Sequence, residues 1–120
     1  MLPRAHRVTS GEQFRAAVRS GRRGGTRALV VHLLVPDPAP TATAAALSAP
    51  PTVGFVVSKA VGNAVVRNRV KRRLRHLAAQ RLDRLPAGGV LIVRAQPSAA
   101  TATAVALAAD LDACLAKVTA

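Results

Sequence analysis

Hydrophobic residues along this chain recur with two periods, that of helices and that of strands. In the first segment, the helical spacing of three and four residues is kept by Phe14, Ala17 and Val18. This pattern predicts a helix over 10–20, with Ser10 and Gln13 at the capping-box spacing and Gly21 as a left-handed C-cap. The Gly/Arg-rich stretch 21–27 that follows is interpreted as a turn.

Three segments have the alternation and composition of β-strands: 28–35, 52–58 and 90–93. One face of the first strand takes Val30, His32 and Leu34, and the other takes Leu29, Val31, Leu33 and Val35. The second strand alternates through Val53, Phe55 and Val57. The third is short and fully apolar, which is typical of a central, buried strand.

Two more helices are predicted in the second half of the chain. The first begins at Asn63, a good N-cap, and runs to about Arg84, where a Pro-Ala-Gly-Gly sequence ends it. The last follows Pro97, and its helical spacing is kept by Leu107, Leu111, Cys114, Leu115 and Val118. Cys114 is the single cysteine, so no internal disulfide can form, and we expect it to be a small core residue.

The order of these elements predicts an α+β domain in which helices pack on one sheet. A chain of 120 residues has room for one such domain, 1–120. Between the first two strands, the segment 36–51 contains five prolines and many alanines. Helix and strand are both disfavoured there, so we expect a flexible loop within the domain.

Charge indicates what this domain binds. Eighteen Lys and Arg residues face five Asp and Glu, for a formal net charge of +13. Such an excess repels itself unless a polyanion neutralises it, and nucleic acid is the usual partner. No apolar stretch approaches the roughly 20 residues that span a membrane. We therefore expect a cytoplasmic protein that has neither a membrane nor a small molecule as its partner.

The predicted helix after Asn63 concentrates this charge. Its apolar stripe consists of Val66, Val70, Leu74 and Leu77, and the remaining surface contains Arg67, Arg69, Lys71, Arg72, Arg73 and Arg75. A merely solvated face normally mixes both signs of charge, because like charges at helical spacing are destabilising. The preference for Arg suits bidentate binding of phosphate. Asn68, between two arginines, is either a tolerated surface residue or a hydrogen-bonding contact to sugar or base edges.

Three other functions are alternatives to a subunit that binds RNA. A protein-only nuclease needs clustered carboxylates or histidines, but the acids are scattered and the three histidines share no spacing. A helix-turn-helix DNA-binding protein needs a paired helix before Asn63, where a strand is predicted instead. A ribosomal protein or RNA chaperone would share the charge and the fold class, and stimulation of a defined cleavage reaction would separate it from a nuclease subunit.

One block of sequence narrows the choice further. Residues 54–72 read Gly-Phe-Val-Val-Ser-Lys-Ala-Val-Gly-Asn-Ala-Val-Val-Arg-Asn-Arg-Val-Lys-Arg. This strand, Ser-Lys, Gly-Asn-Ala and Arg-Asn-Arg order resembles the signature of the ribonuclease P protein family. The flanks resemble the family too, at His6-Arg7-Val8, at Ser20-Gly21 and over 90–97.

The resemblance implies an RNA-binding subunit of ribonuclease P, the endoribonuclease that removes the 5′ leader from precursor tRNA. It implies an αβββαβα sandwich with a left-handed βαβ crossover, including a strand that the pattern above does not show. The catalytic RNA subunit would perform the chemistry with Mg²⁺ that is held mainly by RNA, and the protein would contain no catalytic residue. The partners would be that RNA and precursor tRNA.

The resemblance also implies two sets of site residues. Those for the catalytic RNA are Asn63, Arg67, Asn68, Arg69, Lys71, Arg72, Arg73 and Arg75. Those for a cleft that binds the single-stranded leader, between the first helix and the sheet, are Phe14, Val18, Leu29, His32, Phe55 and Lys59. The chain has no Tyr and only two Phe, and Val18, Leu29 and His32 stand where relatives often have aromatic residues. We therefore expect weaker stacking on the leader, with more of the binding resting on charge and on His32.

Overall fold

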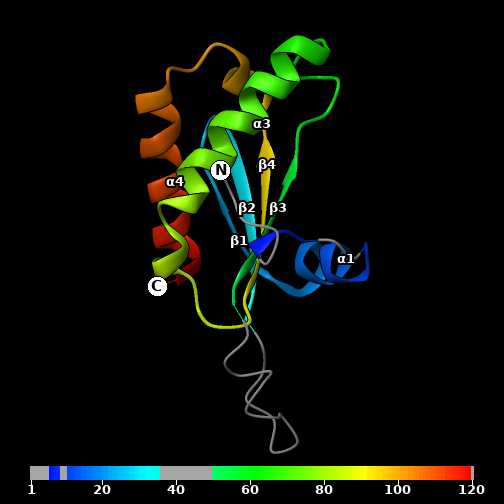
Figure 1. Ribbon diagram of the computed structural model, residues 1–120, viewed down its shortest axis with the longest axis vertical. Helices are drawn as coiled ribbons and strands as arrows, with labels where there is room; N and C mark the ends of the chain where they lie inside the picture. Colours follow the sequence, from blue (N-terminus) through cyan, green and yellow to red (C-terminus); the bar gives the residue numbers. More distant parts are fainter. Residues whose placement is uncertain (1–5, 9–10, 36–49, 120) are drawn as a thin grey trace, which may run out of the picture.

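The computed structural model describes residues 6–8, 11–35 and 50–119, which form a four-stranded sheet with helices on both faces (Figure 1). The elements are α1 (Gly11–Ser20), β1 (Arg22–Gly25), β2 (Leu29–Leu34), β3 (Thr52–Val56), α3 (Ala64–Ala79), the 3₁₀ turn η2 (Leu82–Arg84), β4 (Val90–Ala95), the 3₁₀ turn η3 (Pro97–Ala100) and α4 (Ala104–Thr119). The predicted α+β class and the αβββαβα order are confirmed.

The strands lie in the order β1-β2-β4-β3. β2 pairs antiparallel with β1 and with β4, whereas β3 and β4 are parallel. β4 is therefore a central strand, as its apolar sequence predicted, and all but one of its residues are buried. The exception, Arg94, is exposed.

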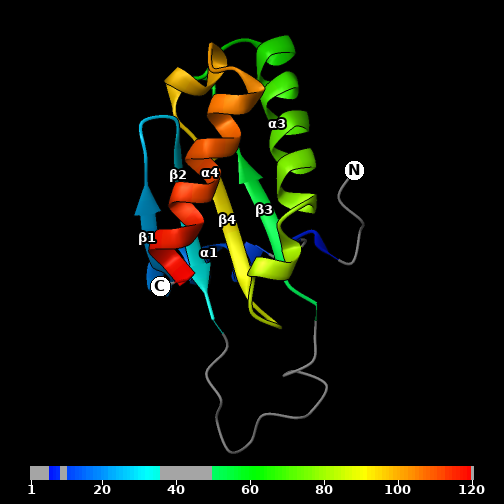
Figure 2. The ribbon, with the colours of Figure 1, turned by 90° about the vertical axis from the view of Figure 1, so that its left-hand side faces the viewer.

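Because β3 and β4 are parallel neighbours, the chain must cross over the sheet between them, and α3 forms this crossover. Figure 2 views the sheet from the side of α3 and α4, with both strands pointing upward. β4 lies to the left of β3 in that view, so the connection is left-handed, as the resemblance implied. Right-handed crossovers are the strong rule, which makes this connection a distinctive feature of the fold.

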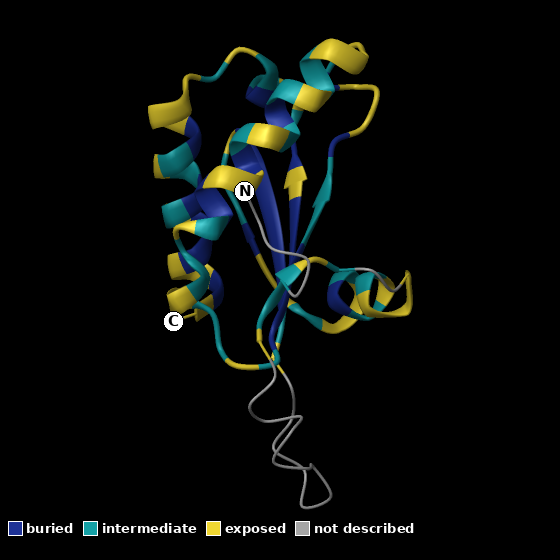
Figure 3. Cartoon of the chain, in the orientation of Figure 1, coloured by how far each residue is buried: buried dark blue, intermediate teal, exposed yellow. Residues whose placement is uncertain are grey.

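Alternation along the strands divides the hydrophobic residues between two cores. The larger core lies between the sheet and the helices α3 and α4, and includes Val31, Leu33, Leu91, Leu74 and Leu111. Cys114 belongs to it and is fully buried, as predicted. The smaller core lies between the other face of the sheet and α1, where Ala17 packs with Val90 and Ile92. The sheet therefore separates two layers of helix (Figures 1 and 3).

The turn predicted at 21–27 is in fact the edge strand β1. Its sequence, Arg-Arg-Gly-Gly, has no hydrophobic alternation, so no side-chain pattern reveals it. The small size of Gly24 lets α4 pack directly over this strand. A Cβ at Gly24 would lie 3.0 Å from the carbonyl oxygen of Cys114 and 3.1 Å from Cγ1 of Val118.

Two helix ends also differ from the prediction. Gly21 is not a left-handed cap, because among the described residues only Gly62 and Gly88 have a positive φ. A side chain at Gly21 would instead collide with the backbone of Leu33, 2.9 Å from the Cβ position. The basic helix α3 ends at Ala79 and not near Arg84, because η2 follows it.

The turn after α3 places Leu82 and Leu85 against the larger core. Two of the predicted features, the Ser10 cap and most of the 36–51 loop, lie outside the described residues.

The close contact at Gly24 gives a stability test. We expect Gly24→Ala to lower the free energy of unfolding by about 1–3 kcal/mol, the usual cost of overpacking. Gly25→Ala is the matched control, because its Cβ would be 3.6 Å or more from its neighbours, an ordinary contact. Urea unfolding of the three proteins measures both values. Equal stability of the two variants would contradict the close packing of α4 on β1.

Candidate nucleic-acid interface

Helix α3 is fixed at its start by a side-chain cap and along its length by an apolar stripe. The Asn63 side chain accepts a hydrogen bond from the Val66 amide at 3.0 Å, as an N-cap residue does. Val70, Leu74 and Leu77 are buried against the sheet, and Val66 packs beside them. The predicted cap and stripe are both confirmed. Together they determine which of the basic residues face outward.

Three of the six expected phosphate-binding residues donate hydrogen bonds to the protein's own backbone. Arg67 Nε donates to the carbonyl of Val57 at 3.0 Å, just after β3. Arg69 donates to the carbonyl of Ala100 at 3.0 Å, and Arg73 to that of Ala102 at 3.2 Å. These bonds join α3 to the residue after β3, to the end of η3 and to the segment between η3 and α4. Arg67, Arg69 and Arg73 therefore have a structural role in the fold.

The side of α3 opposite its buried apolar stripe faces solvent. We call it the outward face, and it consists of Asn68, Lys71, Arg72, Arg75 and His76, which line a shallow hollow of about 450 Å³. Their spacing of three and four residues puts them on one side of the helix. Among the described residues, no carboxylate lies within ion-pair distance of Lys71, Arg72 or Arg75. Figure 3 shows exposed positions recurring along this helix.

The carboxylate of Asp112 neutralises part of the charge beyond the end of α3. It accepts from Arg81 Nε at 2.7 Å and from Arg84 at 2.6 Å. The hydrogen bond from Arg81, followed by smaller effects of both arginines, holds the pKa of Asp112 below its usual value. Asp110, two residues earlier, lies beside Arg27 and Ser98 at another hollow, so the two acids point to different sides of α4.

A second basic surface lies on the face of the sheet that α1 covers in part. Phe14 and Val18 of α1 pack against this face, as expected for the leader cleft. His32 is on the same face, paired across the sheet with Arg23 of β1 and Ile92 of β4. Arg94 stands in the next row, opposite Val30. We call Arg23, His32 and Arg94 the sheet triad.

The sheet triad keeps its histidine neutral. Burial, with 7% of the residue exposed, and then the positive charges of Arg94 and Arg23 lower the pKa of His32 below its usual value. Its Nδ1 atom is buried and has no hydrogen-bond partner among the described residues. At neutral pH, His32 therefore presents an uncharged ring, and the cations beside it are the two arginines.

Two residues expected in the leader cleft lie elsewhere. Leu29 is fully buried in the larger core, on the opposite face of the sheet from His32. Phe55 also packs against that core, toward α3. Lys59 is exposed in the turn between β3 and α3. The expectation for Leu29 and Phe55 was wrong. Successive side chains of a strand point to opposite faces of the sheet, and these two point to the face that α3 and α4 cover.

Sequence reasoning missed Arg23 and Arg94 as members of this surface. Arg94 left a signal, since it is the single charged residue within the apolar run of β4. No sequence pattern indicates Arg23, because the segment that forms β1 has the composition of a turn. Their importance follows from the register of the strands, which brings both beside His32.

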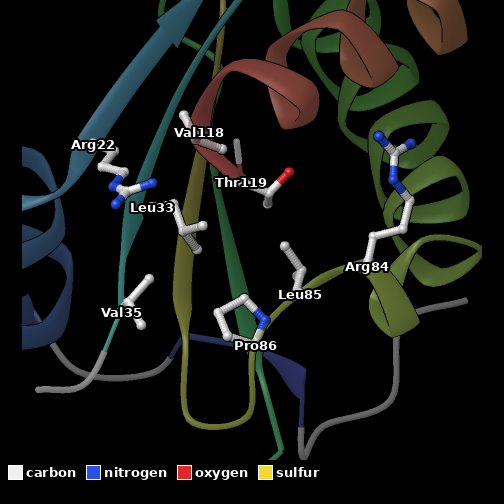
Figure 4. A pocket seen from close by; sticks show the side chains of 8 residues that line it. All are labelled: Arg22, Leu33, Val35, Arg84, Leu85, Pro86, Val118 and Thr119. Atoms are coloured by element: carbon white, nitrogen blue, oxygen red, sulfur yellow. The ribbon is translucent and has the colours of Figure 1, made fainter. Parts of the chain in front are cut away.

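Another hollow, of about 410 Å³, lies at the end of the sheet below α4 (Figure 4). Leu33, Leu85 and Pro86 line its middle, with Arg22 on one side and Arg84 on the other. Most of the residues that line this hollow are apolar, and one of its two arginines, Arg84, is paired with Asp112. It differs in chemistry from the outward face and from the sheet triad.

Two features of the described part of the chain bear on other functions. Its His, Cys, Asp and Glu residues form no group of three that could hold a metal ion. None of its helices is long and apolar enough to cross a membrane.

An outward helix face whose cations have no acidic partner among the described residues, together with a basic sheet surface beside α1, is typical of a small α+β protein that binds nucleic acid. Comparison with known proteins identifies which one. Residues 2–119 match the family model described as Ribonuclease P, and the chain belongs to this family. It is thus the protein subunit of an endoribonuclease that acts in 5′ processing of precursor tRNA, with the enzyme's RNA subunit as its partner.

Relatives and solved structures agree with this assignment. The chain is 56% identical to the ribonuclease P protein component of a Nocardioides species, covering 98% of this chain and 95% of the relative. It is 54% identical to that of Streptomyces griseus, over 96% and 93%. The structure of the Staphylococcus aureus RNase P protein superposes with a TM-score of 0.75 at 25% identity, covering 96% of this chain and 98% of that one.

The buried position of His32 predicts a dependence of stability on pH. Its pKa is lower in the folded chain than in the unfolded one, so its contribution is fully present above about pH 6.5. It is lost as the pH falls through the folded pKa, because the unfolded state then binds the additional proton. We expect urea unfolding to show lower stability at pH 5.5 than at pH 7.5. His32→Gln should reduce this difference in stability. An unchanged difference would contradict a lowered pKa of His32 as its cause.

Proposed function

We propose that the outward face of α3 is the surface that docks on the catalytic RNA subunit. The observation that supports this most is the division of the basic helix. Arg67, Arg69 and Arg73 are engaged with the fold, whereas Lys71, Arg72 and Arg75 have no acidic partner in the described structure. Unpaired guanidinium groups on a rigid helix suit bidentate contacts with phosphate. Asn68, on the same face, would add hydrogen bonds to sugar or base edges.

We further propose that the sheet triad, with Phe14 and Val18 beside it, receives the single-stranded 5′ leader of precursor tRNA. A groove for a single strand combines cations that follow the backbone with surfaces on which bases stack. Here Arg23 and Arg94 would contact phosphates, and the neutral ring of His32 and the side chain of Phe14 would contact bases. This division fits the scarcity of aromatic residues in the chain.

Mg²⁺ enters this proposal through the RNA. The described residues offer no group of three ligands for an ion, so the metal that the chemistry requires would be held by the RNA subunit. The protein's cations would then act beside it. They reduce repulsion between the two RNA backbones, and so lower the Mg²⁺ concentration at which the complex forms. We place this activity in the bacterial cytoplasm.

Cleavage of precursor tRNA by the catalytic RNA at low Mg²⁺, with and without the protein, tests the docking surface. We expect the protein to restore leader removal, and Arg72→Ala/Arg75→Ala to restore much less. In a plot of log binding constant against log salt, this variant should lose a slope of about 1.4–1.8, since each of the two phosphate contacts accounts for about 0.7–0.9. Its stability in urea should match that of the unaltered protein.

Arg69→Ala is the control for this experiment. It removes a cation from the same helix but breaks the bond to Ala100, so we expect a loss of about 1–3 kcal/mol in stability. Its salt slope should change little while the protein remains folded. If Arg69→Ala lowers the salt slope and Arg72→Ala/Arg75→Ala does not, the division of the helix is wrong.

The leader surface is tested by comparing a precursor that has a leader with one that lacks it. Arg94→Ala should weaken binding of the holoenzyme to the first substrate on the order of tenfold, the effect of one charged hydrogen bond. Binding of the second substrate should not change. His32→Ala should also reduce the preference for the leader, whereas Arg72→Ala should leave it unaltered. Equal effects of Arg94→Ala on both substrates would remove the sheet triad from leader binding.

A further inference from the structure

Phe55 occupies a site that neither proposed RNA surface accounts for. Its side chain is half-buried, with one side against the larger core. It also lines a hollow of about 180 Å³ between β3, the N-terminal segment and α3. The other lining residues include Arg7, Lys71 and Arg75, together with Val8 and Val53.

The backbone fixes this hollow on both sides. Arg7 pairs in parallel with Val53, and the Val8 amide donates to the Val53 carbonyl at 3.1 Å, so residues 7 and 8 extend the sheet beyond β3. The ring nitrogen Nδ1 of His6 lies 2.8 Å from the carbonyl oxygen of Pro51 and strengthens this attachment. On the other side, Lys71 and Arg75 are one helical turn apart on α3. An aromatic ring thus lies between cations from two separate segments.

We propose that this hollow binds an unpaired nucleobase of the catalytic RNA, stacked on Phe55, with the adjoining phosphates held by Arg7, Lys71 and Arg75. Three features point to a nucleotide. The described residues of the lining include an aromatic ring and three cations, and none of them is acidic. Base stacking on aromatic side chains between cations is a general mode of binding single-stranded nucleic acid. Lys71 and Arg75 also belong to the outward face, so a backbone that follows α3 would pass the opening.

The site points to the catalytic RNA and not to the leader because of its position. Phe55 is on the face of the sheet toward α3, whereas His32 and α1 are on the opposite face. The inference rests on the proposed docking of α3, and it adds a base-stacking contact to a surface whose other proposed contacts are hydrogen bonds to phosphate, sugar and base edges.

The test uses the full chain and the catalytic RNA. Phe55→Leu keeps an apolar side chain in the core but removes the aromatic ring, and Phe55→Tyr keeps the ring. We expect Phe55→Leu to weaken binding of the catalytic RNA by about 5- to 150-fold, the range that corresponds to one stacked base. Phe55→Tyr should bind within about twofold of the unaltered protein. The salt slope should be the same in all three, because no cation is lost.

Ultraviolet crosslinking of the unaltered protein to the catalytic RNA gives a second readout, which does not depend on the stability of a variant. We expect mass spectrometry to find a nucleotide attached to Phe55. Wild-type affinity of Phe55→Leu would overturn the inference, and so would the absence of an adduct at Phe55. The same crosslinking of the holoenzyme with bound precursor tRNA should also give an adduct with the catalytic RNA, and an adduct with the leader in its place would overturn the inference.

The same experiment separates this inference from the proposed function. If Arg72→Ala/Arg75→Ala weakens binding and Phe55→Leu does not, the docking surface stands and the base site is wrong. If neither change matters, α3 is not the docking surface and both proposals are wrong.

Discussion

The structure depends on how one helix, α3, accommodates charge that it cannot neutralise by itself. Like cations at helical spacing destabilise an isolated helix, and this one has six within nine residues. Burial of Val70, Leu74 and Leu77 holds the helix on the sheet in spite of that repulsion. Backbone carbonyls then accept hydrogen bonds from three of the arginines, and Asp112 pairs with the two that follow the helix. The remaining cations, Lys71, Arg72 and Arg75, lie on the outward face and have no acidic partner in the described part of the chain.

The sheet arranges the rest of the molecule around that helix. Because its strands alternate between faces, a single sheet supports the core under α3 and α4 and, on its reverse, the smaller core under α1. The outward face and the sheet triad therefore lie on opposite sides of a rigid layer. Two RNA molecules can approach such a protein without competing for the same surface, and the packed strands fix the distance between them.

Much of this architecture could be predicted from the sequence. The stripe on α3, the cap at Asn63 and the faces of β2 follow from local periodicity, which sequence displays directly. The edge strand β1 could not be predicted, because Gly24 is selected by the approach of α4 and not by any pattern along the strand. The alternation of side chains along β2 already puts Leu29 and His32 on opposite faces of the sheet. The resemblance to the family assigns both residues to one leader cleft, and for Leu29 that assignment is wrong.

The roles of the individual arginines could not be predicted either. Arg69 and Arg72 are the same residue type, three positions apart, in one basic run. What distinguishes them is that the carbonyl of Ala100, 31 residues further along the chain, lies beside Arg69. Such a partner is a product of the tertiary structure. Sequence spacing shows that a helix face is basic, but not which of its charges the fold itself uses.

The hydrogen bonds from Arg67, Arg69 and Arg73 have a consequence for how this protein can change over evolutionary time. Each of these arginines binds a main-chain carbonyl, and every amino acid supplies that group whatever its side chain. The positions that accept the bonds, Val57, Ala100 and Ala102, can therefore diverge as far as the space beside the core allows, without a compensating change in the helix. The arginines have no such freedom. Selection therefore acts mainly on the arginine of each pair. The basic sequence of the helix is maintained by the requirements of the fold as well as by those of RNA binding.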